Sequence, residues 1–249
     1  MKNLSVFITT SNSLMHCCPT WAYLFNKFWP YKQKVYFLGY KSPSFELPSN
    51  FEYISMGEQR GPKYWSNDIS KAISKYGDDL LYLTFEDSFL IKPVDKEILD
   101  LSIEMGLNVK DDTFSKFCLT ADVQRRPHEV VEIRDGYKVI KATQSSEYRQ
   151  SLSHGIWRKD VFLSKLKLNQ SPWDFELDNE TAMNDGMSVY STLNKYAVHW
   201  GHAYVQGRKL NNWYENAYHD IARGHYHDYE KYARLDKEHV DYVEGRGWL

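Results

Sequence analysis

Cysteines are few in this sequence, and long hydrophobic runs are absent. Of its 249 residues, three are cysteines. Cys17 and Cys18 are adjacent and Cys118 is distant, so they offer no disulfide framework and predict a reducing environment. No segment approaches the roughly 20 apolar residues that cross a bilayer, and the run Leu4 to Ile8 is too short for a signal-peptide core. We therefore expect a cytoplasmic protein, with peripheral membrane contact left open.

A large net charge is also missing. The chain has 31 Lys and Arg residues against 33 Asp and Glu residues, which gives a formal charge of -2. Such a balance provides no field that would attract nucleic acid or anionic lipid. A nucleic-acid partner is therefore not expected.

The length and the apolar content are those of one globular domain. With 249 residues, 42% of them hydrophobic, the chain can bury one substantial core but is short for two. Aromatic residues make up 16% of the chain, including 19 Tyr and 8 Trp. Flat rings with polar tips suit platforms for sugars or bases, although core packing is their commoner use. We find no internal repeat or flexible linker, which predicts one continuous domain.

The first 110 residues alternate between strand and helix patterns. Short apolar runs rich in β-formers are separated by helical spacings, which predicts βαβ units and a mainly parallel sheet. The last run of this half is apolar throughout, as in a strand covered on both faces. The predicted strands are Leu4–Thr10, Lys34–Tyr40, Phe51–Ile54 and Leu80–Phe85, and the predicted helices are His16–Trp29, Tyr64–Tyr76 and Val94–Met105.

The pattern changes in the second half of the chain. Two β-rich runs flank Asp135-Gly136, a pair that tolerates the positive φ angles of a type I′ hairpin turn, so an antiparallel section is predicted here. From residue 218 the chain is a polar tail, which we expect to be helical. The predicted elements are strands at Glu129–Ile133, Tyr137–Lys141 and Tyr148–Ile156, a helix at Lys159–Lys167, and late strands within Tyr196–Leu210 broken at Gly207.

Two acidic residues follow the apolar strand at 80–85. In open α/β sheets ligands collect at the carboxyl ends of the strands, so Glu86 and Asp87 stand where chemistry is expected. Two carboxylates in such a place can hold Mg²⁺ or Mn²⁺ against a diphosphate. The alternative is that the pair only solvates a turn, and the residues alone favour neither interpretation.

A second candidate motif is SPWDFELDNE, residues 171–180. Ser171 can cap a helix, Pro172 suits its first position, and Asp174 can complete a capping box. Glu176 would lie about one turn inside this helix, where a carboxylate could take the proton from an acceptor hydroxyl, and Trp173 could stack against a sugar ring. The structural alternative is that the acids complement the helix dipole, which explains Asp174 well.

Taken together, these motifs resemble the GT-A glycosyltransferases. The resemblance covers roughly residues 1 to 210 and is carried by LLYLTFEDSFL at 80–90, YRQSLSHGIWRKDVFL at 148–163, and SPWDFE at 171–176. It implies an α/β, Rossmann-like single domain whose mostly parallel central sheet has a smaller antiparallel section in the C-terminal half. Residues 1–217 would form this domain, with a nucleotide-sugar-binding half at 1–110 and an acceptor half at 111–217, and 218–249 would be the tail.

The same resemblance assigns roles to individual residues. Ser88 departs from the family, because a second acid commonly stands there, so the resemblance leaves open whether a divalent cation, Mn²⁺ or Mg²⁺, is required. A late histidine supplies a metal ligand in some relatives, which points to His199 or His202. The residues implied are Thr9, Thr10, Ser11, Arg60, Lys63, Trp65, Asp87 and Arg208 for the donor and its diphosphate, Glu86, Asp87 and His202 for the metal, Trp173 and Asp174 for the acceptor, and Glu176 as the catalytic base.

The expected activity is transfer of a sugar from a nucleoside-diphosphate sugar, such as a UDP or GDP sugar, to a glycan or other hydroxyl acceptor, with inversion and a carboxylate base. A retaining transferase on the same fold would not need Glu176. A non-catalytic carbohydrate-binding module is the third interpretation, and it fits the aromatic content. A nucleotidyltransferase is disfavoured because no Gly-rich phosphate loop follows the first strand.

Overall fold

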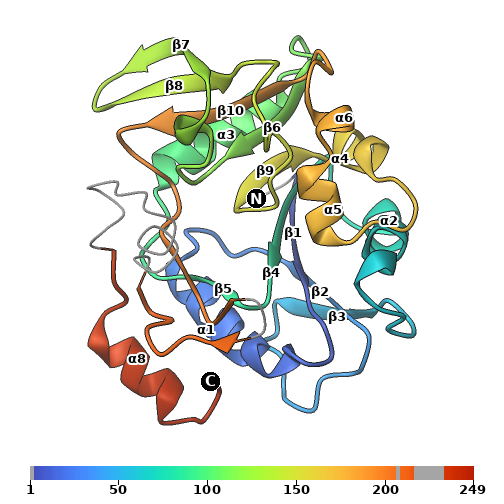
Figure 1. The fold of residues 1–249 in the computed structure, drawn as a ribbon. Helices are drawn as coiled ribbons and strands as arrows, with labels where there is room; N and C mark the ends of the chain where they lie inside the picture. Colours follow the sequence, from blue (N-terminus) through green and yellow to red (C-terminus); the bar gives the residue numbers. More distant parts are fainter. Residues whose placement is uncertain (1–2, 206–207, 216–232) are drawn as a thin grey trace.

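A nine-stranded sheet runs through the whole molecule (Figure 1). The computed structural model describes residues 3–205, 208–215 and 233–249. Within them the strand order of this sheet is β3-β2-β1-β4-β9-β6-β10-β8-β7. Its strands are β1 (Leu4–Thr9), β2 (Val35–Gly39), β3 (Phe51–Ser55), β4 (Leu80–Phe85), β6 (Phe114–Cys118), β7 (His128–Arg134), β8 (Tyr137–Ala142), β9 (Gly155–Arg158) and β10 (Ser188–Leu193).

The strand directions make the sheet largely parallel. β3, β2, β1 and β4 pair in parallel, and so do β6 and β10. β9 is antiparallel to both of its neighbours, and β8 is antiparallel to β10 and β7. The predicted α/β class, with a mostly parallel sheet and a smaller antiparallel section in the C-terminal half, is confirmed.

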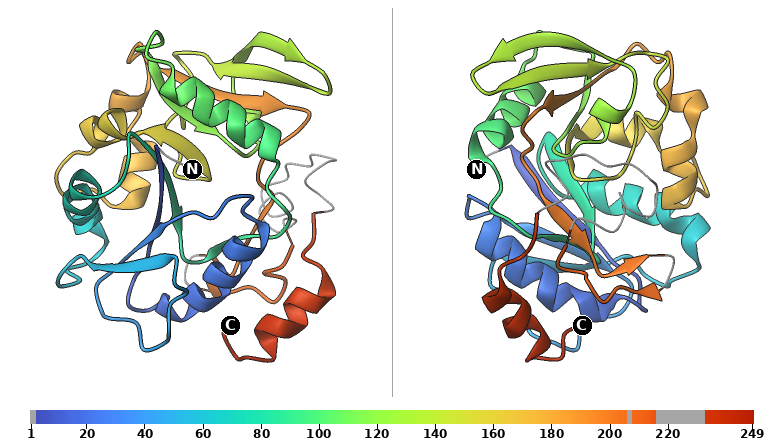
Figure 2. Two further views of the ribbon diagram at one scale, coloured as in Figure 1. Left: turned by 180° about the vertical axis from the view of Figure 1, so that it is seen from behind. Right: turned by 60° about the vertical axis from the view of Figure 1, so that its left-hand side comes forward.

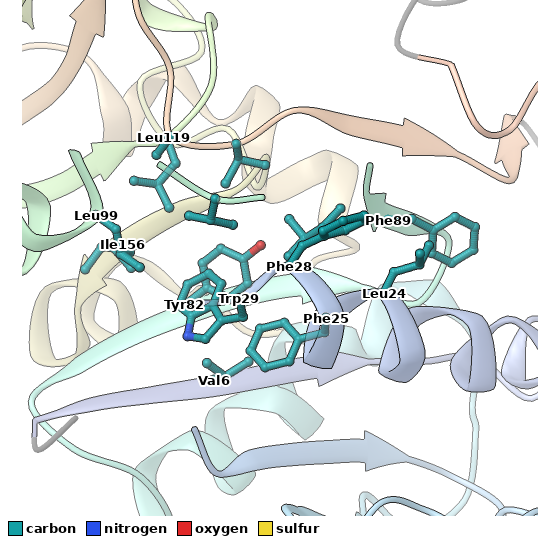
Figure 3. Close-up of a cluster of buried hydrophobic side chains, with 14 of the residues drawn as sticks. Val6, Leu24, Phe25, Phe28, Trp29, Tyr82, Phe89, Leu99, Leu119 and Ile156 are labelled. Carbon is teal, nitrogen blue, oxygen red and sulfur yellow. The ribbon is translucent and has the colours of Figure 1, made fainter. Parts of the chain in front are cut away.

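Alternating side chains of the central strands fill two separate cores. In β1 and β4, Val6 and Tyr82 point to one face of the sheet, while Phe7 and Leu83 point to the other. Successive side chains of a strand point to opposite faces, so a strand covered on both sides is apolar throughout. Figure 3 shows the first core, in which α1 side chains such as Phe25 lie over Val6 and Tyr82.

The helices cover both faces of the sheet (Figure 2). One core contains side chains of α1, α3 and α8, and the other contains side chains of α2, α4 and α5. α6 begins directly after α5 at Asp178, which caps it. The helices are α1 (Cys18–Phe28), α2 (Trp65–Lys75), α3 (Lys96–Leu107), α4 (Lys159–Lys165), α5 (Pro172–Leu177), α6 (Asn179–Ala182) and α8 (Lys237–Glu244), with short 3₁₀ turns η1 (Met15–Cys17), η2 (Pro62–Tyr64) and η3 (Val123–Arg125).

Two small ladders lie outside the main sheet. β5 (Ser88–Leu90) pairs antiparallel with β11 (Trp200–His202). β12 (Tyr204–Val205) pairs with β13 (Arg208–Lys209). The first ladder joins residues 200–202 to the segment after β4, and the second pairs residues 204–205 with 208–209, so the late strands predicted from the sequence do form. The predicted break at Gly207 lies outside the described residues.

One predicted strand is wrong and three strands were not predicted. The segment 148–154 is a loop, and only residues 155–158 of this region form a strand. Tyr148 has a positive φ of 60°, which a strand does not accommodate. The strands that were not predicted are β5, which is three residues long, β6, which carries Lys116 at its centre, and β10, which is rich in serine and threonine.

The C-terminal helix packs on α1. Val243 is fully buried, and His239 Nδ1 lies 2.9 Å from the Tyr23 hydroxyl. Helix α8 and helix α1 lie side by side in both figures. The predicted boundary at 217/218 lies outside the described residues. No helix in the described part of the chain is long and apolar enough to span a membrane.

Candidate active site

The carboxyl ends of β1 and β4 lie side by side at the centre of the sheet. β2 and β3 extend from β1 in one direction, while β4 and the later strands extend in the other, so the chain reverses its strand order between β1 and β4. In open α/β sheets this switch point opens the crevice in which ligands bind. The backbone N–H of Ser11, after β1, donates to Glu86 Oε1, after β4, at 3.0 Å. Ser11 and Glu86, two of the predicted site residues, therefore meet at the switch point between β1 and β4.

Glu86 is a buried carboxyl with an unusual proton affinity. Its side chain is 4% exposed. Burial, together with the charge of Asp87, raises the pKa of Glu86 to about 8, although the bond from Ser11 opposes the rise. A carboxyl that keeps its proton at neutral pH adds no negative charge to the crevice. Glu86 therefore ties the loop after β1 to β4, and Asp87 is the acid left to face a ligand.

Asp87 lies beside His202. Asp87 Oδ2 is 3.6 Å from His202 Nδ1, and the Asp87 carbonyl accepts a hydrogen bond from Ala203 N at 2.9 Å. In the β5·β11 ladder His202 is opposite Ser88. Side chains of directly opposite residues lie on the same face of a ladder. Asp87, Ser88 and His202 are thus held together by backbone pairing.

The three predicted metal ligands do not converge as one set. Among the described residues, no group of three or more His, Cys, Asp or Glu side chains is arranged to hold a metal ion. Glu86 accepts hydrogen bonds from Ser11 through Oε1, and its predicted role as a ligand stays a prediction. Asp87 and His202 remain as a pair of suitable donors. A divalent cation held by this pair would take its other ligands from water and phosphate oxygens, as Mg²⁺ commonly does.

The donor residues predicted after β1 fall into two groups. Thr9 and Thr10 are buried, and Thr10 is occupied locally, because its N–H bonds the Leu38 carbonyl and its hydroxyl bonds the Ser11 carbonyl. Ser11 is half-buried and also bonds Ser13 through its hydroxyl. Of the three, Ser11 is the residue that reaches the surface of the crevice.

Arg60 and Lys63 lie on the other side of the loop after β1. The Arg60 guanidinium forms an ion pair of 2.6 Å with the buried Asp68 and lies 4.4 Å from the centre of the Tyr64 ring. Lys63 is exposed and lies 5.1 Å from the same ring. The charge of Arg60 is already paired with Asp68, so Lys63 is the more available of the two to bind an anion.

Trp65, which was predicted to contact the donor, lies in the core. Its side chain is 5% exposed, and its ring packs against Phe85 and Phe175. An indole in this position joins α2, β4 and α5. It places α5 relative to the strand end and does not present a face to a ligand.

A basic hairpin lies next to the loop after β1. His16 in η1 has its Nε2 2.9 Å from the Tyr204 hydroxyl of β12. The positive charge of Lys209, in β13, acts on the Cys17 thiol, so this strand runs close to η1. Arg208 and Lys209 are both exposed. Arg208 was predicted to meet the diphosphate, and it lies in β13, which pairs with the strand that contacts η1.

Helix α5 begins as predicted. Ser171 and Asp174 form a capping box, and this confirmed role occupies Asp174. The hydrogen bonds from the Ser171 N–H and hydroxyl hold the pKa of Asp174 below its usual range. The predicted acceptor contact of Asp174 stays a prediction. Trp173, in contrast, is 64% exposed and free to stack against a ring.

Glu176 joins the edge of the sheet through the segment 151–154. Its Oε1 accepts a hydrogen bond of 2.6 Å from Leu152 N. Two residues later, His154 Nε2 lies 2.8 Å from Ser88 Oγ, next to Asp87. One short segment therefore contacts both Glu176 and Ser88, the residue next to Asp87. Two surface cavities, one beside Asp95 and one beside His16, are lined by neither Asp87 nor Glu176.

The residues that hold this segment were not predicted from the sequence. Asp122, after β6, accepts hydrogen bonds from the hydroxyls of Ser151 and Ser153. Lys116 is fully buried and donates to the Ser151 carbonyl. Gly155 allows this approach, because a Cβ there would lie 2.5 Å from Lys116 Cε. The signal was the sequence SLSHG, whose hydroxyls and glycine fit a loop better than a strand.

His154 is buried between two hydroxyl groups. Its Nδ1 bonds the Tyr82 hydroxyl and its Nε2 faces Ser88 Oγ. Burial, assisted by the charge of His202, lowers the pKa of His154 to about 3. His154 is therefore a neutral imidazole, which has one donor and one acceptor nitrogen.

Comparisons with known proteins add a limited structural likeness. No family model matches the chain, and no curated protein matches it. Among solved structures, a CMP:2-keto-3-deoxy-manno-octonic acid synthetase complexed with CTP is 11% identical, with a TM-score of 0.44, over 80% of this chain and 92% of that chain. Residues 1–349 of S. aureus TarS are 14% identical, with a TM-score of 0.48, over 80% of this chain and 59% of that chain. The chain thus spans about three fifths of the TarS structure.

Proposed function

We propose that this protein is a glycosyltransferase that uses a nucleoside-diphosphate sugar. The observation that carries the proposal is the meeting of Ser11, Glu86 and Asp87 at the switch point between β1 and β4. Phosphorylated nucleotides bind in this crevice of open α/β sheets. The exposed Arg208 and Lys209 beside the crevice supply positive charge for a diphosphate leaving group.

Asp87 and His202 are the residues that would hold a divalent cation. Their side chains come from two elements that are fixed by the β5·β11 ladder, so their separation does not depend on a mobile loop. Such a cation supplies charge neutralisation for a departing diphosphate. The chain's own contribution is to orient the two ligands and, through the neutral Glu86, to keep further negative charge away from the phosphates.

Glu176 is the proposed base for the acceptor hydroxyl. The Leu152 N–H fixes its carboxylate through one oxygen, and α5 also presents the exposed ring of Trp173. A ring that stacks on Trp173 would place a sugar acceptor next to Glu176. In an inverting reaction this carboxylate removes the hydroxyl proton while the hydroxyl oxygen attacks the anomeric carbon and the diphosphate departs from the opposite face.

Calorimetric titration with UDP, GDP and dTDP, with and without Mn²⁺, tests the donor half. Asp87→Asn should weaken binding in the presence of Mn²⁺ by about tenfold or more, since hydrogen bonds and metal contacts of a charged group contribute about 1.5–3 kcal/mol. Asp79→Asn, at the other end of β4, is the matched control and should bind as the wild type does. If the wild type binds none of the nucleotides, the proposal is wrong and a carbohydrate-binding module becomes the better interpretation.

Glu176→Gln tests the catalytic half. The amide keeps the shape of the side chain but cannot accept the proton, so turnover should fall on the order of 10²–10⁴-fold with little change in nucleotide affinity. Product analysis by NMR then reports the anomeric configuration. Normal turnover of the variant, or retention of configuration, would remove Glu176 from the mechanism and favour a retaining transferase.

A further inference from the structure

The hydroxyl of Ser88 has one visible partner, and that partner is buried. Ser88 is 6% exposed and His154 is 2% exposed. Ser88 Oγ lies 2.8 Å from His154 Nε2 and has no other hydrogen-bond partner among the described residues. On its other side His154 bonds the hydroxyl of Tyr82. The three side chains form a short chain from the core to the edge of the sheet.

The protons of this chain can be arranged in two ways. In the first, Tyr82 donates to His154 Nδ1 and His154 Nε2–H donates to Ser88, so the Ser88 proton points elsewhere. In the second, Ser88 donates to Nε2 and Nδ1–H donates to Tyr82, so the Tyr82 proton needs another acceptor. Each arrangement leaves one hydroxyl proton without an acceptor among these three side chains.

The burial of Tyr82 decides between the two arrangements. Tyr82 is 0% exposed, its ring packs on Trp29, and its hydroxyl has no partner except His154 among the described residues. A buried hydroxyl proton without an acceptor costs about 1–3 kcal/mol. The first arrangement avoids this cost, because Tyr82 then donates to His154. It leaves the free proton on Ser88, at the edge of the sheet.

Ser88 lies close to Asp87 and His202, and this position determines which groups its hydroxyl proton can reach. Ser88 and His202 are directly opposite in the β5·β11 ladder, and His202 lies 3.6 Å from the carboxylate of Asp87. Trp200, two residues before His202, contacts the rings of both His154 and His202. The Ser88 hydroxyl therefore belongs to the same small cluster as the proposed cation ligands.

We infer that Tyr82 and His154 orient Ser88 as a hydrogen-bond donor to a phosphate oxygen of the nucleoside diphosphate. The inference rests on the proposed function, because it needs a diphosphate beside Asp87. A serine at this position gives the site a neutral donor for an anionic oxygen where a carboxylate would repel it. Ser88 is the binding residue, and Tyr82 and His154 are positioning residues that act through it.

Nitrogen-15 NMR of the His154 ring tests the relay without any ligand. The expected tautomer carries its proton on Nε2 at neutral pH, and the signal is assigned by its loss in His154→Gln. Tyr82→Phe removes the donor to Nδ1, so the preference for this tautomer should weaken. A proton on Nδ1 in the wild type would overturn the relay, whatever the protein binds.

Calorimetry with the nucleoside diphosphate that the wild type binds, in Mn²⁺, tests the role of Ser88. Ser88→Ala should weaken binding about tenfold, whereas Ser88→Thr, which keeps the hydroxyl, should stay within about threefold. Tyr82→Phe should also weaken binding although its side chain cannot reach a ligand. Tyr53→Phe is its control, because Tyr53 lies in β3, which contributes nothing to this cluster.

The outcomes separate the inference from the proposed function. If the wild type binds a nucleotide but Ser88→Ala binds equally well, the inference is wrong and the proposed function stands. Equal losses in the alanine and threonine variants would assign Ser88 a packing role and would also overturn the inference. If the wild type binds no nucleotide, both the proposed function and the role of Ser88 as a phosphate ligand are wrong.

Discussion

The ends of β4 and β6 each carry a carboxyl group at the same edge of the sheet, and the two groups have opposite proton affinities. Glu86, after β4, is buried and accepts hydrogen bonds from the N–H and the hydroxyl of Ser11. Its pKa is raised to about 8 by burial and by the charge of Asp87. Burial also acts on Asp122, after β6, but bonds from Ser153 and Ser151 and the nearby charge of Lys116 hold its pKa below the usual range.

The difference shows that partners, more than position, decide the charge of a carboxyl at a strand end. Asp122 is an anion that accepts hydrogen bonds from two serine hydroxyls, so it holds the segment 151–154 in place. Glu86 has few donors and a neighbouring acid, so it keeps its proton. The two strand ends therefore divide their tasks: one fixes the scaffold of the site, and the other leaves Asp87 as the charged group in the crevice.

Removing the charge of Asp122 should have the largest effect on stability. In Asp122→Asn, the two serine hydroxyls lose their charged acceptor and Lys116 loses a compensating charge, so we expect a loss of about 3 kcal/mol at pH 7. Urea unfolding measures it. The loss should shrink on acidification. The pKa of Asp122 is lower in the folded protein than in the unfolded chain, so its charge stabilises the fold above the unfolded-state pKa. This stabilisation disappears as the pH falls through the folded-state pKa.

The control for this variant is Glu104→Gln on the exposed face of α3. A substitution at such a site changes stability by about 0.5 kcal/mol or less. If Asp122→Asn unfolds at the same urea concentration as the control, Asp122 does not hold the scaffold, and the contrast with Glu86 disappears.

Glu86→Gln should have an effect of the opposite sign. The pKa of Glu86 is higher in the folded protein than in the unfolded chain. As the pH rises from about 4.5 toward 8, Glu86 therefore loses its proton in the unfolded chain but keeps it in the folded protein, and the stability of the fold falls progressively. The amide keeps an acceptor for Ser11 and cannot ionise. Relative to the wild type, the variant should gain about 2 kcal/mol between pH 6 and pH 8, at about 1.4 kcal/mol for each pH unit. Parallel unfolding profiles of the two proteins over this range would show that Glu86 is an ordinary ionised carboxylate.

The first strand end was predictable from the sequence and the second was not. The run 80–85 is apolar in every residue and ends in two acids, so both the buried strand β4 and the site after it can be recognised locally. The same holds for the capping box of α5 and for the hairpin turn at Gly136, whose φ is 81°. Each of these features is a property of a few neighbouring residues.

The strand β6 and the network at its end depend on contacts between distant segments. From the sequence alone, Lys116 would be expected at the surface. It is buried because its ammonium group donates a hydrogen bond to the Ser151 carbonyl and lies over the Trp157 ring. Ser88 and His154 are 66 positions apart. A single sequence offers no signal for such pairs. For the same reason Trp65 was placed at the donor site, although Phe85 and Phe175 enclose it in the core.

Ser153→Ala tests the comparison of the two strand ends, because it leaves Asp122, like Glu86, with fewer hydrogen-bond donors. Asp122 would keep the bond from Ser151 at 2.9 Å and lose its other hydroxyl donor. Its pKa should rise toward the ordinary aspartate value, as a titration followed by carboxyl ¹³C NMR would report, and the protein should lose about 1 kcal/mol of stability at pH 7. Ser145→Ala, at an exposed position of the preceding loop, should change neither quantity. If the pKa of Asp122 stays low in Ser153→Ala, the charge of Lys116 and the remaining hydroxyl suffice to keep it ionised, and the number of hydroxyl donors is not what separates the two strand ends.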